Sequence, residues 1–157
     1  MERRGPLEVS TQTMTSSPTD RELEELLALA TNLALEAGQI HERREMGVAE
    51  TKSSITDPVT AVDKEAEEFI SQEIRKARPD DGIIGEEETS VAGSSGLRWV
   101  IDPLDGTVNY LYQYPSYAVS IGIERDGSPL VGVVYDSVRG LLYAARAGAP
   151  ATRNGKP

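Results

Sequence analysis

The chain has 157 residues, a 38% apolar composition and a formal net charge of −10. This length and composition suit one globular domain with a hydrophobic core, and the acidic charge disfavours nucleic acid and anionic membranes as partners. The sequence contains no cysteine, which excludes disulfides, thiolate metal sites and a cysteine nucleophile from these residues. No apolar run reaches the length of a membrane span, and we expect a cytoplasmic protein.

The N-terminal part predicts a tail followed by a long helix. Residues 1–19 are rich in Ser, Thr and Pro without an apolar period, so we expect a disordered tail. From Asp20 to about Met46, apolar residues recur at spacings of three and four, which predicts a helix. Thr19 and Glu22 form a capping-box pattern at its start. His41, the sole histidine, lies near the polar end and is expected to be solvated.

The rest of the chain predicts one more helix and then strands. The second helix runs from about Asp63 to Arg78 and stops before Pro79. Short apolar runs between turn residues then predict strands with tight connections, which favour an antiparallel meander. The predicted strands are Gly82–Ile84, Leu97–Ile101, Tyr117–Glu124, Pro129–Asp136 and Leu141–Ala147.

Helices followed by a meander predict the α+β class, with two N-terminal helices packed on one face of a mainly antiparallel sheet. The turn signal Asn154-Gly155 has no predicted strand after it, which suggests that residues 20–157 are the N-terminal part of a larger domain. On that view we expect an unpaired sheet edge near Arg146 and an apolar sheet face without a second layer.

Acidic residues follow two of the predicted strands. Glu86–Glu88 come directly after the first strand, and Asp102 and Asp105 follow the second. Residues three apart on a straight strand face opposite sides, so the two aspartates can share a ligand only if the chain bends, which Pro103 and Gly106 favour. Carboxylates ~4 Å apart repel by about 4 kcal/mol at an effective dielectric of about 20, so such a pair needs a cation or a shared proton.

Two interpretations of these acidic residues compete. In one, the aspartates are turn residues and the glutamates form a solvated surface. In the other, they form a site for a hard cation, Mg²⁺ before Mn²⁺ or Ca²⁺, because all the donors are oxygen atoms. The occurrence of both clusters after strands, with Thr107 and Asn109 next to the second, favours the metal site.

Three stretches resemble one known family. They are "GEE" (Gly85–Glu87), "WVIDPLDGTVNY" (Trp99–Tyr110) and "YAVSIGI" (Tyr117–Ile123), and they resemble the inositol monophosphatase family of Mg²⁺-dependent, lithium-sensitive phosphatases. The resemblance runs from about Asp20 to Pro157. It implies that the chain is the N-terminal α+β part of the layered αβαβα fold that this family shares with fructose-1,6-bisphosphatase.

The resemblance also implies roles for individual residues. The implied metal ligands are Glu86, Asp102, the backbone carbonyl of Leu104, and Asp105, with Asp102 bridging two ions. The implied catalytic residues, which activate water, are Asp63, Glu86 and Thr107. The implied substrate contacts are Glu86, Asp105, Gly106 and Thr107. Asn109 is expected to hold the turn, and Trp99 and the tyrosines of "YLYQYP" to pack in the core and the loop.

The implied activity is Mg²⁺-dependent hydrolysis of a small phosphate monoester by metal-activated water, with inositol 1-phosphate as the leading substrate. An aspartyl-phosphate phosphatase is a weaker alternative, because its D-x-D-x-T motif differs from the D-x-x-D-G-T found here. Another alternative is a non-catalytic binding or regulatory module that keeps the fold. The family's second half carries a further metal-ligating aspartate, so we expect residues 1–157 alone to be inactive. Since family members are often homodimers, a homodimer is also expected.

Overall fold

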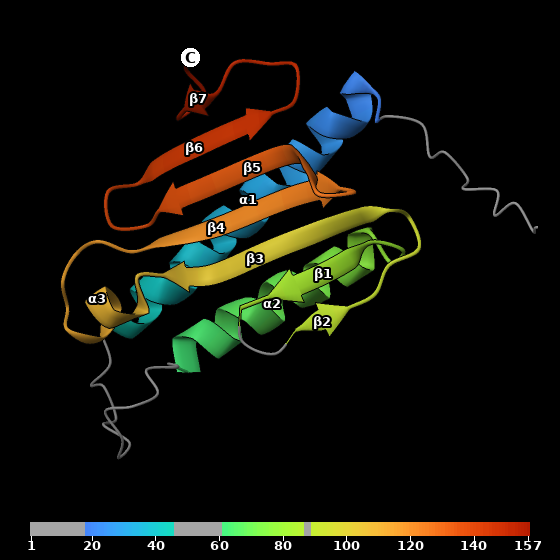
Figure 1. The fold of residues 1–157 in the computed structure, drawn as a ribbon. Coiled ribbons are helices and arrows are strands. Elements are labelled where there is room, and N and C mark those ends of the chain that lie inside the picture. Colours follow the sequence, from blue (N-terminus) through green and yellow to red (C-terminus); the bar gives the residue numbers. More distant parts are fainter. Residues whose placement is uncertain (1–17, 46–60, 87–88) are drawn as a thin grey trace, which may run out of the picture.

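The computed structural model describes residues 18–45, 61–86 and 89–157. The predicted tail, apart from its last two residues, lies outside this range, as do Glu87 and Glu88. Two long helices, α1 (Asp20–Glu45) and α2 (Ala61–Ala77), lie side by side on one face of a sheet (Figure 1). This arrangement confirms the expected α+β class and the packing of both helices on the same face.

Helix α1 begins as its sequence predicts. The Thr19 hydroxyl accepts a hydrogen bond from the Glu22 amide at 3.2 Å, and the Thr19 carbonyl accepts one from the Leu23 amide, so the first turn is capped. Small residues on the buried side allow close contact with the sheet, and a Cβ atom on Gly38 would lie 2.4 Å from the Tyr135 ring. The buried apolar residues of α1 are Leu23, Leu26, Ala30, Leu33, Ala34, Ala37 and Ile40.

The described strands form one seven-stranded sheet in the order β2-β1-β3-β4-β5-β6-β7. Strands β3 to β7 pair as the antiparallel meander that the tight connections predict. Strand β1, however, pairs with β3 in parallel, because the chain between them first forms β2 on the far side of β1. The strands are β1 (Gly82–Gly85), β2 (Ser90–Val91), β3 (Leu97–Asp105), β4 (Ala118–Arg125), β5 (Ser128–Asp136), β6 (Leu141–Arg146) and β7 (Thr152–Arg153).

A short strand that the sequence does not predict lies at the C-terminal sheet edge. Strand β7 pairs with Tyr143 and Ala144 of β6, and the turn at Asn154-Gly155 closes on a bridge between Arg153 and Lys156. The pairing of β6 with β7 does not extend to Arg146, where the unpaired edge is expected. The Arg146 side chain forms ion pairs with Asp20 and Glu24 of α1.

The two faces of the sheet differ in burial. Trp99, Ile101, Ile121 and Val133 are buried against the helices. On alternate positions, large apolar side chains are exposed, as expected for a face without a second layer. These exposed residues are Ile84, Val100, Val134 and Tyr143.

The loop between β2 and β3 depends on a glycine. A Cβ atom on Gly93 would lie 2.2 Å from the Gly82 backbone nitrogen and 2.5 Å from the Asp81 carbonyl carbon. Backbone atoms cannot give way as side chains do, so Gly93→Ala is expected to destabilise the fold by about 2–3 kcal/mol. Chemical denaturation measures this effect. Gly132→Ala is the control, because nothing lies within 4 Å of its added Cβ atom, and equal midpoints for the two variants would contradict the packing argument.

Candidate active site

The predicted bend in the Asp102–Asp105 stretch is present at the end of β3. Asp102 pairs with Ser120 and Asp105 pairs with Ala118, so the register shifts by one residue between the two aspartates and forms a β-bulge. The chain then turns at Gly106, which has φ +96°. A Cβ atom there would lie 2.9 Å from the Ser116 carbonyl oxygen. The bulge removes the strict alternation that would send the two side chains to opposite faces.

The electrostatics of Asp102 show which carboxyl groups come together. Partial burial raises the pKa of Asp102, and the nearby Glu86 and Asp105 raise it further, to about 7. Glu86 acts both through its charge and through a hydrogen bond to Asp102. The Leu104 amide, which donates to Asp102 Oδ1 at 3.2 Å, works in the opposite direction. Glu86, Asp102 and Asp105 therefore form one mutually repelling acidic cluster.

Thr107 links this cluster to helix α2. Its hydroxyl lies 2.9 Å from the Leu104 carbonyl oxygen and 3.4 Å from Asp63 Oδ2, and its one proton can serve only one of these acceptors at a time. Asp63 is 1% exposed and comes from the first turn of α2. The structure thus places Asp63 and Thr107 together, next to the backbone of the bulge.

The donor atoms near the bulge have the chemistry of a hard-cation site, although the described side chains do not form one by themselves. Across residues 18–45, 61–86 and 89–157, no three Asp, Glu, His or Cys side chains are arranged to hold a metal ion by themselves. The Glu86 and Asp102 carboxylates together with the Leu104 carbonyl offer oxygen donors alone, which are the donors that Mg²⁺ prefers. A cation would also relieve the repulsion that raises the pKa of Asp102.

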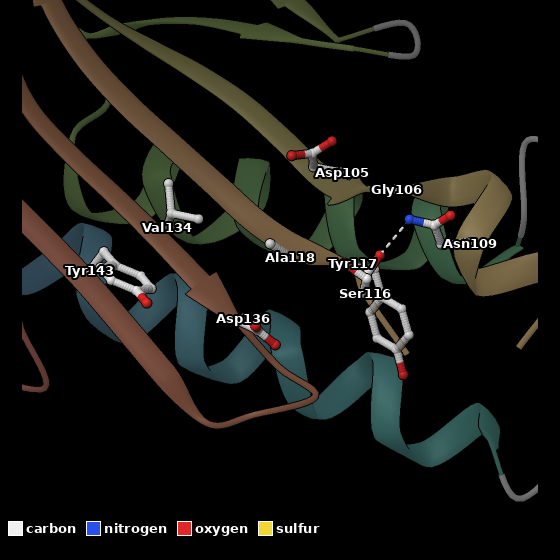
Figure 2. A pocket seen from close by; sticks show the side chains of 9 residues that line it. All are labelled: Asp105, Gly106, Asn109, Ser116, Tyr117, Ala118, Val134, Asp136 and Tyr143. Carbon is white, nitrogen blue, oxygen red and sulfur yellow. Dashed lines mark hydrogen bonds between the residues drawn. The ribbon is translucent and has the colours of Figure 1, made fainter. Parts of the chain in front are cut away.

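A hollow of about 290 Å³ lies beside the bulge (Figure 2). Asp105 and Gly106 form one end of its lining, and Asp136 and Tyr143 form the other. Asn109, also in the lining, donates a hydrogen bond to the Ser116 carbonyl at 2.7 Å, which confirms that it holds the turn. Asp105 therefore belongs both to the acidic cluster and to the lining of a hollow of small-molecule size.

His41 lies next to the backbone of the candidate site, which the sequence analysis does not predict. The prediction that it is solvated is wrong, because its side chain is fully buried. Its Nε2 lies 2.9 Å from the Pro103 carbonyl oxygen and its Nδ1 lies 3.2 Å from Ser137 Oγ. The available signal is its spacing: His41 follows Ala37 by four residues, so it continues the buried stripe of α1.

The aromatic predictions are confirmed in part. Trp99 is fully buried, and Tyr110 packs edge-on against Tyr117 with ring centroids 4.9 Å apart. Tyr112 and Tyr114, by contrast, are 77% and 62% exposed. They follow the short helix α3 (Thr107–Leu111), where the chain lies over the surface.

The raised pKa of Asp102 has a consequence for stability. Between the usual pKa of 3.8 and about 7, the folded protein holds a proton that the unfolded chain has lost, so stability falls as pH rises through this window. Asp102→Asn removes the charge and keeps an oxygen for the Leu104 amide. At pH 8 without metal, we expect the free energy of unfolding of this variant to exceed that of the unmodified chain by about 1–2 kcal/mol. This value allows for solvent screening. The gain should vanish near pH 3.5, and a less stable variant at pH 8 would contradict the acidic cluster.

Comparisons with known proteins identify the family of the chain. The model of the inositol monophosphatase family matches residues 22–157, and the chain belongs to this family. It is 42% identical over 134 residues to the Nus factor SuhB of Pasteurella multocida, covering 82% of this chain and 50% of that protein. It is 39% identical over 135 residues to the histidinol-phosphatase of Chlorobaculum parvum, covering 83% and 51%.

A solved structure shares the fold. The structure of inositol monophosphatase from Anabaena superimposes with a TM-score of 0.74 at 38% identity, covering 86% of this chain and 49% of the other. The chain spans about half the length of the curated relatives it matches. None of the helices in the part of the chain that the structure describes is long and apolar enough to cross a membrane.

Proposed function

We propose that the complete protein hydrolyses a small phosphate monoester in an Mg²⁺-dependent reaction, with inositol 1-phosphate as the first candidate substrate. The observation that carries this proposal is the acidic cluster, in which partial burial together with the neighbouring Glu86 and Asp105 raises the pKa of Asp102 to about 7. Such a cluster is costly without a cation. Family membership and the relatives named as phosphatases support the same reaction class.

Each residue of the site has its own role in the proposed reaction. Glu86, Asp102 and the Leu104 carbonyl would hold one ion, and Asp105, together with Asp102, would hold a second. When bound, Mg²⁺ supplies positive charge that attracts the phosphate and lowers the pKa of water. Thr107 would orient a water molecule through its hydroxyl, and the buried Asp63, which contacts that hydroxyl, would accept a proton. The Gly106 turn allows close approach of a phosphate to the backbone.

A second candidate function is a non-catalytic binding or regulatory role. The relative from Pasteurella multocida is named a Nus factor, which is a statement about that protein. For this chain the net charge of −10 opposes direct binding to nucleic acid. In this role the chain would therefore bind another protein. A homodimer and a cytoplasmic location belong to the proposal as well.

Phosphate release tests the proposed reaction. The purified complete protein is incubated with inositol 1-phosphate or histidinol phosphate, with Mg²⁺ or with EDTA. We expect turnover with Mg²⁺ and at least a 100-fold loss with EDTA, because without cations the acidic cluster repels the phosphate. Turnover that persists in EDTA would contradict the metal-dependent mechanism. Absence of turnover with either substrate, in a protein that still binds Mg²⁺, would favour the non-catalytic role.

The chain of residues 1–157 is expected to show no more than trace hydrolysis under the same conditions. The acidic cluster supplies part of the ligand set, and the resemblance implies that a further aspartate ligand lies in the family's second half. The same assay on the purified 157-residue chain measures this. Mg²⁺-dependent turnover equal to that of the complete protein would show that residues 1–157 suffice.

A further inference from the structure

His41 couples helix α1 to the backbone that carries two proposed metal ligands. The ring is fully buried, and its Nε2 lies 2.9 Å from the carbonyl oxygen of Pro103. Pro103 sits between Asp102 and Leu104, inside the β-bulge, where the register with β4 skips from Asp102 to Asp105. The imidazole therefore contacts the one stretch of β3 that the strand ladder does not hold.

A single peptide group connects the ring to the Asp102 carboxylate. The Pro103 carbonyl accepts the hydrogen bond from His41, and the Leu104 amide of the same peptide donates to Asp102 Oδ1 at 3.2 Å. A peptide group is planar, so fixing its carbonyl also fixes the direction of its N–H. The direction of that N–H in turn selects the orientation of the carboxylate that accepts from it.

Thr107 holds the next carbonyl along the chain. The Leu104 carbonyl oxygen accepts from the Thr107 hydroxyl at 2.9 Å, and its peptide begins where the Pro103–Leu104 peptide ends. His41 and Thr107 thus hold the bulge from two sides. Both hydrogen bonds act on backbone carbonyls that directly follow Asp102 in the chain.

The surroundings of His41 fix its tautomer. A carbonyl oxygen can only accept, so Nε2 must carry a proton. In the neutral ring Nδ1 then accepts from the Ser137 hydroxyl, 3.2 Å away. The rings of Tyr110 and Tyr117 lie 6.1 and 5.8 Å from the imidazole, and Tyr110 Oη donates to the backbone carbonyl of His41. The ring itself is held by these two hydrogen bonds and by packing against the two tyrosine rings, whereas the Tyr110 hydroxyl contacts the backbone.

We infer that His41 is a positioning residue for the acidic site: its Nε2–H orients the Pro103–Leu104 peptide and thereby the Asp102 carboxylate. The consequence for metal binding rests on the proposed function. The hydrogen-bond chain itself does not, so it can be tested without metal.

The first test uses NMR on the metal-free 157-residue chain. His41→Phe keeps a planar ring but removes the donor, whereas His41→Gln offers an amide N–H at about the reach of Nε2. We expect the Leu104 amide proton and the Asp102 carboxyl carbon to shift in His41→Phe and to return toward their original positions in His41→Gln. Tyr110→Phe is the matched control, because it removes a hydrogen bond to the His41 backbone and should leave both signals unchanged.

Three results would overturn the inference. One is an unchanged pair of signals in His41→Phe, and another is an equal change in His41→Phe and His41→Gln, which would make ring packing the cause. If His41→Phe does not fold, the imidazole ¹⁵N shifts of the unmodified chain decide: a proton on Nε2 supports the inference, and a proton on Nδ1 alone overturns it.

The second test measures Mg²⁺ binding by calorimetry with the complete protein. We expect His41→Phe to weaken Mg²⁺ binding about tenfold, as is typical when a residue that orients a ligand is lost, and His41→Gln to restore most of the affinity. If the unmodified protein takes up no Mg²⁺, the proposed function fails while the NMR result stands. If Mg²⁺ binds equally well to the unmodified protein and His41→Phe, the inferred effect of His41 on the ligands is wrong.

Discussion

Asp102→Asn is expected to abolish Mg²⁺-dependent phosphate release by the complete protein, lowering kcat/KM at least about 100-fold. The amide has the shape of the carboxylate and can still accept from the Leu104 amide, so the bulge should persist. The variant loses the negative charge at the centre of the acidic cluster, where Glu86 and Asp105 act on Asp102. A loss of about 3 kcal/mol of transition-state stabilisation corresponds to a factor of about 100 in rate.

The matched control for this prediction is Asp126→Asn. Asp126 is an exposed residue of the turn between β4 and β5, with φ +52°, a conformation that asparagine also tolerates. We expect this variant to keep full activity. Asp105→Asn should behave like Asp102→Asn, because the resemblance assigns it to the second ion. Normal turnover by Asp102→Asn and Asp105→Asn would refute the assignment of the site.

Asp81→Ala is expected to destabilise the fold by about 3–5 kcal/mol, the largest effect on stability that we predict for a single polar residue. Asp81 is 3% exposed and accepts hydrogen bonds from Ser95 Oγ at 2.6 Å, Arg78 Nε at 2.9 Å and Trp99 Nε1 at 3.0 Å. Its removal leaves the buried indole N–H and the guanidinium without this acceptor, and breaking such a network is costly. Urea denaturation of the 157-residue chain measures the loss.

Glu73→Ala is the control for Asp81→Ala. Glu73 forms an ion pair with Lys76 on the exposed side of α2, and such surface pairs contribute less than about 1 kcal/mol. We expect its denaturation midpoint to stay close to that of the unmodified chain. Similar midpoints for Asp81→Ala and Glu73→Ala would show that the buried network adds little.

The Asp81 network also predicts how stability depends on acid. Burial alone raises the pKa of Asp81, but hydrogen bonds from Arg78, Ser95 and Trp99 outweigh burial and hold the pKa below its usual value of 3.8. The unfolded chain therefore takes up this proton at a higher pH than the folded one. The stabilisation is complete above pH 3.8 and is lost as pH falls through the folded pKa. In Asp81→Asn, the free energy of unfolding should therefore lack this loss as the pH falls below 3.8, which denaturation at a series of acidic pH values measures.

Much of the fold follows from local patterns in the sequence. The spacing of apolar residues predicts α1 and α2 within one or two residues of their ends. Alternating apolar residues between turn formers predict β4, β5 and β6 and their antiparallel order. These features depend on neighbours in the chain, so the period of the side chains is enough to identify them.

The sequence predicts only part of the acidic site, and the structure supplies the rest. The "DPLDGT" stretch predicts the bend at Pro103 to Gly106, which the bulge in β3 confirms. The contact of Glu86 with Asp102 follows from the parallel pairing of β1 and β3, which places the ends of both strands at one edge of the sheet. The roles of Glu86, Asp63 and Thr107 in catalysis stay predictions from the resemblance.

By itself, the sequence determines the helices, the antiparallel meander and the bend in the "DPLDGT" stretch. Each of these is set by patterns among residues that lie close together in the chain. Only the tertiary structure decides the parallel β1–β3 pair and the hydrogen-bond partners of the buried His41. The partners of His41, Pro103 and Ser137, lie 62 and 96 residues away along the chain. Its neighbours in the sequence are charged and suggest a solvent-exposed position. In the folded chain, however, the Pro103 carbonyl and the Ser137 hydroxyl lie next to the ring. Burial of a polar group depends on such distant partners, and a local pattern carries no information about them.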